Sequence, residues 1–199
     1  MEVGRPVLGV VGGPYLEQAS EQALAALERQ LEQLQEAGFA LRRVPILEDI
    51  EDINERHLEL TAAEFAQVHE AWFDEYEALY RPRTAALIRH GREVSGAMVE
   101  KGRTGRAALR QQLAEQMRVH GVDMWVCPPA TGTAPVALNY TGDPCMNLPW
   151  THAGLPALNL PAGRAANGLP LGLQCCAAAG QDEELLAWGG MLEDVLRHG

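Results

Sequence analysis

Side chains that could act as nucleophiles or bases are scarce in this chain of 199 residues. It holds two serines, Ser20 and Ser95, and one lysine, Lys101. Cys145 and His152 could form a thiol nucleophile with its base, but one Cys and one His in a proline-rich loop make a weak pattern. Structural thiols, buried or partly exposed, are the favoured interpretation of the cysteines.

The cysteine and histidine spacings do not indicate a metal site. The cysteines are Cys127, Cys145, Cys175 and Cys176. They lack C-x-x-C spacing, and adjacent cysteines do not readily ligate one metal in tetrahedral geometry. His69 lies outside an H-E-x-x-H pattern, and His57 and His90 have no ligand pattern. We therefore expect no metal and no other cofactor.

A Gly-Gly turn follows the first apolar run, residues 6–11, where a phosphate-binding loop could lie. Gly9, Gly12 and Gly13 do not form G-x-G-x-x-G, and no Lys-Ser/Thr follows them. Pro14 also removes a backbone donor that a phosphate would need. A tight turn is the favoured interpretation.

The charge balance limits the class of partner. With 27 acidic and 16 basic side chains, the formal net charge is −11, which argues against a nucleic-acid partner. Charged residues interrupt every apolar run before membrane-spanning length, and the first residues lack the order of a signal peptide. We expect a single domain over residues 1–199, no membrane association and a cytoplasmic location.

The first forty or so residues predict a strand, a helix and a second strand. Residues 6–11 form the first strand, and Ser20 caps a helix that ends at Gly38. Residues 39–44 form the second strand. The inward face of the helix is predicted from leucines at steps of three and four: Leu24, Leu27, Leu31 and Leu34. This order predicts a right-handed crossover in a parallel or mixed sheet.

The middle of the chain is predicted to be helical. Residues 61–64, Thr-Ala-Ala-Glu, fit a capping box, and the helix that follows is expected to run towards residues 81–82. Its predicted apolar face consists of Phe65, Val68, Trp72, Tyr76 and Leu79. A second helix is expected from Thr104 to Gly121, with Leu109, Leu113 and Met117 on its apolar face.

The last third of the chain predicts three strands and a helix. Residues 123–127 read as a strand, 155–161 and 169–176 as two further strands, and a final helix begins at Gln181 or Asp182. The intervening irregular segment, residues 128–150, is long for a loop in a compact domain. Such loops are usually functional, so this segment is the first place to look for a site.

The same region carries specific motifs. They are the Ala-Pro at 134–135, Thr-Gly-Asp at 141–143, Gly-Leu-Pro-Ala at 154–157, Pro161, Gly163, and Gly-Leu-Pro-Leu-Gly-Leu-Gln at 168–174. In this combination the chain resembles the C-terminal half of an amidase signature family enzyme. The resemblance covers essentially the whole chain, and it implies an α/β fold with a mixed sheet flanked by helices.

The resemblance implies amide hydrolysis by a serine nucleophile, activated by a second serine that a lysine holds. In the family these residues lie in a Gly/Ser-rich run and at an upstream lysine, which nothing in residues 1–199 matches. We therefore assign no catalytic residue, and read Ser95 as a turn or cap residue and Asp143 as a turn acid. The family gives Lys101 no role.

The resemblance does imply substrate-binding residues, namely Asn147, Trp150 and Thr151, just before the Gly-Leu-Pro-Ala step. An amide, an indole and a hydroxyl can stack on a ligand and hydrogen-bond to it. The alternative is that Trp150 is packed core and that Asn147 and Thr151 tie down the loop backbone.

Two functions follow from the resemblance. The first is the C-terminal part of an amidase that acts on a small amide substrate, with the missing N-terminal half as partner. The second is a free-standing, non-catalytic relative that binds a ligand or a partner. An uncovered sheet would also favour a homo-oligomer.

Overall fold

The computed structural model describes residues 4–136 and 139–197, which divide into two compact units. Unit 1 comprises the described residues of Met1–Ile50 and Leu109–Gly199, and unit 2 comprises Glu51–Ala108. Unit 1 contains the sheet, whereas unit 2 is helical. The prediction of a single domain over residues 1–199 stays a prediction.

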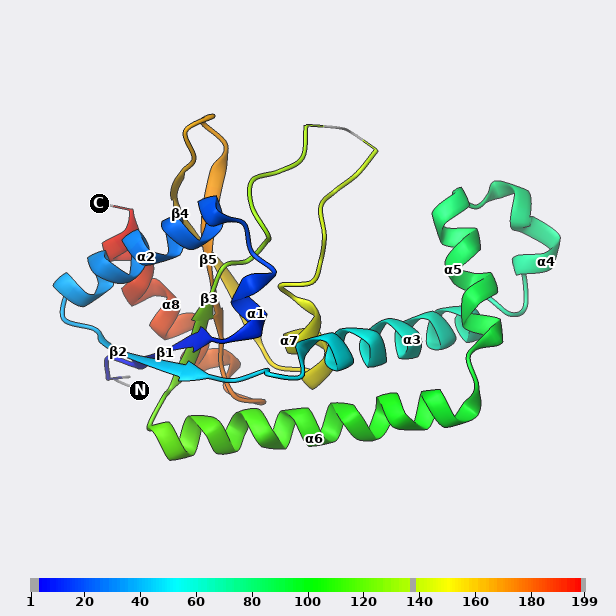
Figure 1. Cartoon of the computed structure of the whole chain (residues 1–199), viewed down its shortest axis with the longest axis horizontal. Coiled ribbons are helices and arrows are strands. Elements are labelled where there is room, and N and C mark those ends of the chain that lie inside the picture. The colour runs from blue at the N-terminus through cyan, green and yellow to red at the C-terminus, as the bar shows by residue number, and fades with distance from the viewer. Residues whose placement is uncertain (1–3, 137–138, 198–199) are drawn as a thin grey trace. The chain divides into compact units, whose positions relative to one another are not determined.

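Unit 1 is built on a five-stranded sheet with the order β2-β1-β3-β5-β4 (Figure 1). The strands are β1 (Val7–Gly12), β2 (Ala40–Pro45), β3 (Met124–Cys127), β4 (Ala157–Arg164) and β5 (Pro170–Cys176). β1 pairs in parallel with β2 and β3, whereas β5 pairs antiparallel with β3 and β4. The predicted mixed sheet is therefore confirmed. The apolar runs of β1 and β3 are buried because these strands are central.

Helices α2 (Glu21–Glu36) and α8 (Asp182–Leu196) share one hydrophobic core with the sheet (Figure 1). α2 begins as predicted, because the Oγ of Ser20 accepts a hydrogen bond of 3.2 Å from the backbone N–H of Ala23. It ends before Gly38, whose φ of 88° is a backbone conformation that glycine adopts readily and other residues rarely adopt. The helices contribute Leu27, Leu31, Leu34, Leu185, Trp188 and Leu192 to this core.

The remaining helices of unit 1 are two short ones, α1 (Pro14–Glu17) and α7 (Leu148–Ala153), and the end of α6 (Gly96–His120). α6 begins eight residues earlier than the predicted Thr104, and it ends before Gly121 as predicted. Leu109, Leu113 and Met117 are buried, as the spacing predicts.

Unit 2 differs from its prediction. Its first helix, α3, is Ile50–Val68, so Thr61 lies in the helix interior and the predicted capping box is wrong. The helix also stops at Val68, and α4 (Phe73–Tyr76), the 3-10 turn η1 (Glu77–Leu79) and α5 (Pro82–Glu93) follow. The predicted apolar face is largely exposed, at 63% for Val68 and 82% for Leu79.

The predicted face is exposed because the helices of unit 2 pack through small residues and not through the large apolar side chains of that face. A Cβ added at Gly91 of α5 would lie 1.9 Å from the carbonyl oxygen of Ala62 in α3. The two backbones therefore meet, and Ala62 and Ala66 are buried where the prediction placed Val68. Ala66, Phe73, Ala85 and Ile88 form a small hydrophobic cluster in the unit.

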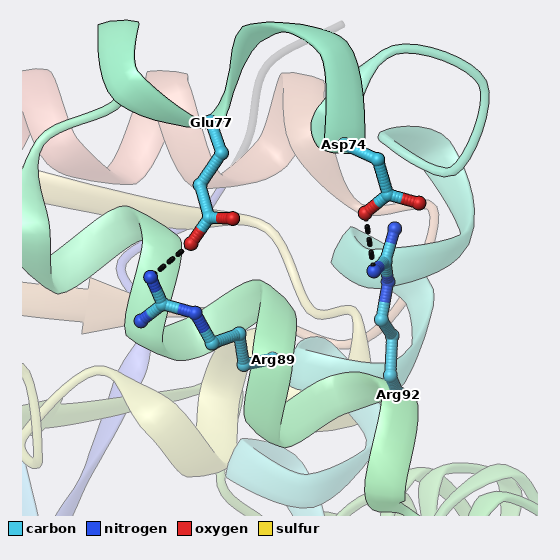
Figure 2. A network of polar contacts seen from close by, with 4 residues as sticks. All are labelled: Asp74, Glu77, Arg89 and Arg92. Atoms are coloured by element: carbon cyan, nitrogen blue, oxygen red, sulfur yellow. Dashed lines mark hydrogen bonds and ion pairs between the residues drawn. The ribbon is translucent and has the colours of Figure 1, made fainter.

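Ion pairs tie α4 and η1 to α5 in this unit. Figure 2 shows Arg92 facing Asp74, at 2.7 Å between Nη1 and Oδ1, and Arg89 facing Glu77. All four side chains are solvent-accessible, so each pair is expected to stabilise the unit only slightly.

Candidate functional site

A cavity of about 500 Å³ opens in unit 1 beside the long loop that the sequence marked as a place for a site. We call it the loop cavity. Its walls come from α2, the loop, β4 and β5: Ala23, Ala26, residues 128–135 and 140–143, Asn159, Pro161 and residues 170–172. The volume is sufficient for a small organic molecule.

Hydrogen bonds to backbone carbonyls, donated by one backbone N–H and two side-chain amides of neighbouring elements, hold the loop cavity in shape. The N–H of Ser20 donates to the carbonyl of Thr131 at 2.7 Å, which joins the start of α2 to the loop. The Nδ2 of Asn147 donates to the carbonyl of Pro129 at 3.0 Å. Buried Gln30 donates through Nε2 to the carbonyls of Ala162, at 2.8 Å, and Gly172, at 3.4 Å. These contacts fix both sides of the cavity.

The lining of the loop cavity is almost uncharged. Alanine, glycine and proline make up most of it, with hydroxyls from Thr131, Thr133, Tyr140 and Thr141. Asp143 is the one charged residue among the described lining residues. Its Oδ1 accepts a hydrogen bond of 2.9 Å from the N–H of Cys145, which confirms the predicted turn role. This lining can bury and hydrogen-bond a ligand, but it offers no activated nucleophile.

The three predicted substrate-binding residues lie at or near α7, and none of them lines the loop cavity. Asn147 is the N-cap residue of α7 and bonds to the loop through Pro129. Trp150 is only 1% exposed, whereas Thr151 is exposed to solvent. Their role in substrate binding stays a prediction.

A buried polar cluster around Tyr15, which the sequence did not reveal, supports this region. The phenol oxygen lies 2.7 Å from the carbonyl oxygen of Met146 and 3.2 Å from the Sγ of Cys127. It also accepts a hydrogen bond of 3.1 Å from the Nε1 of Trp150. Burial raises the pKa of Tyr15 well above its ordinary value, so the phenol stays neutral and donates. The cluster joins α1, β3 and α7.

The cysteine thiols are either buried or have a raised pKa. Cys127 is fully buried, and although burial opposes its ionisation, hydrogen bonds from Cys176 and Tyr15 lower its pKa. Burial, followed by the charge of Asp143, raises the pKa of Cys145 to about 11, which opposes thiolate formation at neutral pH. Burial likewise raises the pKa of Cys175 and of Cys176. His152 is fully buried in α7. These properties agree with structural thiols.

Both serines act as helix caps. The Oγ of Ser20 caps α2, and the Oγ of Ser95 accepts a hydrogen bond of 3.3 Å from the N–H of Met98 at the start of α6. The predicted cap role of Ser95 is thus confirmed. Lys101 lies within α6 and is exposed. Within residues 4–136 and 139–197, no group of three or more His, Cys, Asp or Glu side chains could hold a metal ion.

A model of one known family, Amidase, matches residues 4–186. The chain belongs to the amidase family. The family resemblance predicted from the motifs at 134–174 is therefore confirmed, and so is the fold class.

Individual relatives agree with this assignment. Over 104 residues, 48% of this chain and 20% of the relative, the chain is 36% identical to a glutamyl-tRNA(Gln) amidotransferase subunit from Granulibacter bethesdensis. Over 129 residues it is 29% identical to a putative amidase, AmiA2, of Mycobacterium tuberculosis, which covers 57% of this chain and 25% of that one.

Among solved structures, an amidase superposes with a TM-score of 0.87 and 27% identity, covering 98% of this chain and 47% of that one. A fatty acid amide hydrolase at 17% identity and a TM-score of 0.80 shares the fold. The chain spans less than half the length of the proteins that it matches. In the described part of the chain, no helix has the length and apolar character needed to cross a membrane.

Proposed function

We propose that this chain is the carboxyl-terminal part of an amide hydrolase, and that it supplies scaffold and one wall of the substrate pocket. The nucleophile and its relay would come from the rest of the amidase fold, on the same or another polypeptide. The observation that carries this proposal is the family match over residues 4–186 together with the use of both serines as helix caps. Among the described residues, neither serine hydroxyl hydrogen-bonds to a base that could take its proton.

The proposed pocket wall consists of the loop cavity and the residues before the Gly-Leu-Pro-Ala step. The nearly uncharged lining suits a small neutral amide, whose carbonyl and N–H groups can bond to hydroxyls and backbone. Asn147 couples the two parts, because it begins α7 and bonds to Pro129 in the cavity loop. We place Trp150 and Thr151 at the border of the pocket, where Trp150 orders α7 through Tyr15.

A second candidate function is ligand binding without catalysis. The loop cavity favours it, because residues of this chain are sufficient to form a cavity of about 500 Å³, which has room for a small molecule. In both cases we expect the chain to act in the cytoplasm and to associate with another polypeptide or with itself.

The test is hydrolysis of simple aryl and alkyl amides by the purified chain. We expect no rate above buffer, because both serines cap helices, Cys127, Cys175 and Cys176 are buried, and the pKa of Cys145 is raised. Turnover that disappears in Ser95→Ala or Cys145→Ala, but survives in the matched variant Ser20→Ala, would overturn the proposal. Binding of small amides without turnover, even when the amino-terminal half of an amidase is added, would favour the second function.

A further inference from the structure

A second cavity, of about 230 Å³, lies next to the loop cavity in unit 1. α2, the β4–β5 hairpin and the end of α8 form its walls, and Figure 1 shows both helices beside that hairpin. We call it the arginine pocket, because Arg29 of α2 and Arg164 of β4 line it. Both arginines are exposed, so a ligand can reach them from solvent.

The charges in the arginine pocket are not balanced. Arg29 and Arg164 are its only charged residues among those that the structure describes. The Nη1 of Arg164 donates to the carbonyl of Gly168 at 2.8 Å, and Arg29 has no hydrogen bond or ion pair in the described part of the chain. Glu28, the carboxylate next to Arg29 in the sequence, pairs with Arg43 instead. Two positive charges therefore line this cavity without a carboxylate to neutralise them.

This arrangement contrasts with the rest of a strongly acidic chain. Acidic side chains outnumber basic ones by 27 to 16, so carboxylates are plentiful. Six other arginines form ion pairs with them: Arg43, Arg89, Arg92, Arg106, Arg118 and Arg197. Two arginines that share one cavity and no carboxylate indicate that the matching anion comes from outside the chain.

A buried glutamine also lines the arginine pocket. Gln30 is 4% exposed, and the carbonyls of Ala162 and Gly172 accept hydrogen bonds from its Nε2. These two bonds fix the orientation of the side-chain amide. Its Oε1 accepts no hydrogen bond from the described residues, so Oε1 is the group that Gln30 can offer to a ligand. A well-matched ligand therefore combines negative charge with an O–H or N–H donor.

The end of α8 opposes an anion only weakly. Leu196 is the last residue of α8 and lines the pocket. The C-terminus of a helix carries a partial charge of roughly −0.5, whereas each guanidinium group carries a full positive charge at neutral pH. Arg197, next to Leu196, pairs with Glu193, and the two charges offset each other. The balance at the pocket therefore stays positive.

We propose that the arginine pocket binds a phosphate group, from inorganic phosphate or from a small phosphate monoester that has a free hydroxyl. Two guanidinium groups match a dianion, because each can donate to phosphate oxygens. The O–H of hydrogen phosphate, or the hydroxyl of the monoester, supplies the donor for the Oε1 of Gln30. The cavity is smaller than those that hold drug-sized molecules, which agrees with a small anion. This site requires neither amide hydrolysis nor the rest of the amidase fold.

Binding in the arginine pocket would also affect the loop cavity. Ala26 and Leu171 line both cavities. Gln30 connects them as well, because Gly172, whose carbonyl it holds, lines the loop cavity. A phosphate that bonds to the Oε1 of Gln30 would hold this amide from a further side. We therefore expect the bound anion to stabilise the hairpin wall that the two cavities share.

The experiment titrates the chain, at micromolar concentration and constant ionic strength, with inorganic phosphate, glycerol phosphate or acetate. Amide hydrogen exchange is followed in peptides that contain residues 29–33 and 162–171. We expect phosphate to protect both segments in a saturable way, with half-saturation at about one millimolar or below. Acetate carries one charge and should bind at least about tenfold more weakly. Glycerol phosphate distinguishes the two sources, because a monoester site binds it more tightly than inorganic phosphate.

A matched pair of variants tests the pocket itself. Arg29→Gln and Arg118→Gln each remove one positive charge from an exposed position on a helix of unit 1, but Arg118 does not line the pocket. Arg29→Gln should weaken phosphate binding about tenfold or more, because it removes a charge-assisted hydrogen bond, whereas Arg118→Gln should change it less than about twofold. Arg164→Gln should weaken binding to a similar extent as Arg29→Gln.

Three outcomes would overturn the inference. Equal effects of Arg29→Gln and Arg118→Gln would mean that phosphate responds only to the overall charge. Protection that rises equally in a peptide from unit 2, such as residues 82–93, would mean that phosphate stabilises the whole protein as an excluded salt. The third is the absence of saturable protection up to about ten millimolar phosphate. Phosphate binding without amide hydrolysis under any condition leaves the inference intact and counts against the proposed function.

Discussion

The two units of this chain are stabilised in different ways. Unit 1 has a core of seventeen buried residues shared by the sheet, α2 and α8, and a buried polar cluster around Tyr15. Unit 2 has fewer buried apolar residues: a cluster of Ala66, Phe73, Ala85 and Ile88, with Ile53, Leu60 and Ala62 buried outside it, and with exposed rings and ion pairs at its surface. Buried apolar area provides most of the free energy of folding, so unit 2 is the part expected to open first.

The same substitution in each unit gives the largest expected contrast. Trp150→Ala removes a fully buried ring and a donor to Tyr15, so it should lower the free energy of unfolding of unit 1 by roughly 3–5 kcal/mol. Trp72 is 42% exposed, and its Nε1 bonds to His69 at 3.1 Å. Trp72→Ala should lower that of unit 2 by only about 1 kcal/mol.

Hydrogen exchange resolved by residue measures both values, because it reports the opening of each unit separately. Comparable losses for the two tryptophan variants would mean that unit 2 is as tightly packed as unit 1.

A second pair of variants tests the close helix contact in unit 2. Gly91→Ala should destabilise the unit by about 1–3 kcal/mol, because the new Cβ meets the Ala62 carbonyl and the helices must separate. Gly96→Ala is the control, since nothing lies within 4 Å of its added Cβ. It should be neutral or stabilise α6 by up to about 1 kcal/mol. Urea unfolding followed by helical circular dichroism distinguishes the two.

A smaller effect is expected from the ion pairs in Figure 2. Arg89→Gln should reduce the stability of unit 2 less than Gly91→Ala does, because both partners are solvent-accessible. Arg92→Gln should cost more than Arg89→Gln, since the guanidinium of Arg92 also lies 4.9 Å from the ring centre of Phe73. Thermal unfolding at low and high salt provides the measurement. A large, salt-insensitive loss in Arg89→Gln would show that the pair is more than a surface contact.

The smallest effect is a pH dependence confined to unit 2. Burial, followed by the charge of Arg106, lowers the pKa of His57 below 6.5. As the pH falls through 6.5, the unfolded chain therefore binds this proton more readily than the folded unit does. The free energy of unfolding of unit 2 should fall in that range, and His57→Gln should flatten the dependence. An unchanged pH profile in the variant would assign the effect to other groups.

Local sequence patterns predicted unit 1 well, because the apolar residues of its strands and helices recur at the spacing typical of each element. The valine-rich run of β1 and the leucine steps of α2 place each element and its inward face, and the motifs after β3 identify the family. Unit 2 was predicted poorly. Helix α3 ends at Val68. The next four residues, His69, Glu70, Ala71 and Trp72, include neither glycine nor proline, so the local sequence does not predict the end of the helix.

The hydrogen bonds that hold the candidate site in shape could not be predicted, for a different reason. Tyr15 contacts Cys127 and Met146, and Gln30 contacts Ala162 and Gly172, across more than a hundred residues of sequence. Such pairings depend on how the strands are ordered in the sheet, and periodicity does not encode that order. The residues before Gly154 could be proposed from the family motif, whereas the walls of the loop cavity required the three-dimensional structure.

The outer strand β4 has a consequence for handling the isolated chain, because residues 157–163 carry no charge and β4 pairs with β5 alone among the described strands. A bare strand of low charge is a template for uncontrolled growth into aggregates as well as for correct assembly. Production of the chain by itself is therefore expected to give material that is lost from solution on concentration. The substitution Ala157→Lys should improve the yield of soluble protein.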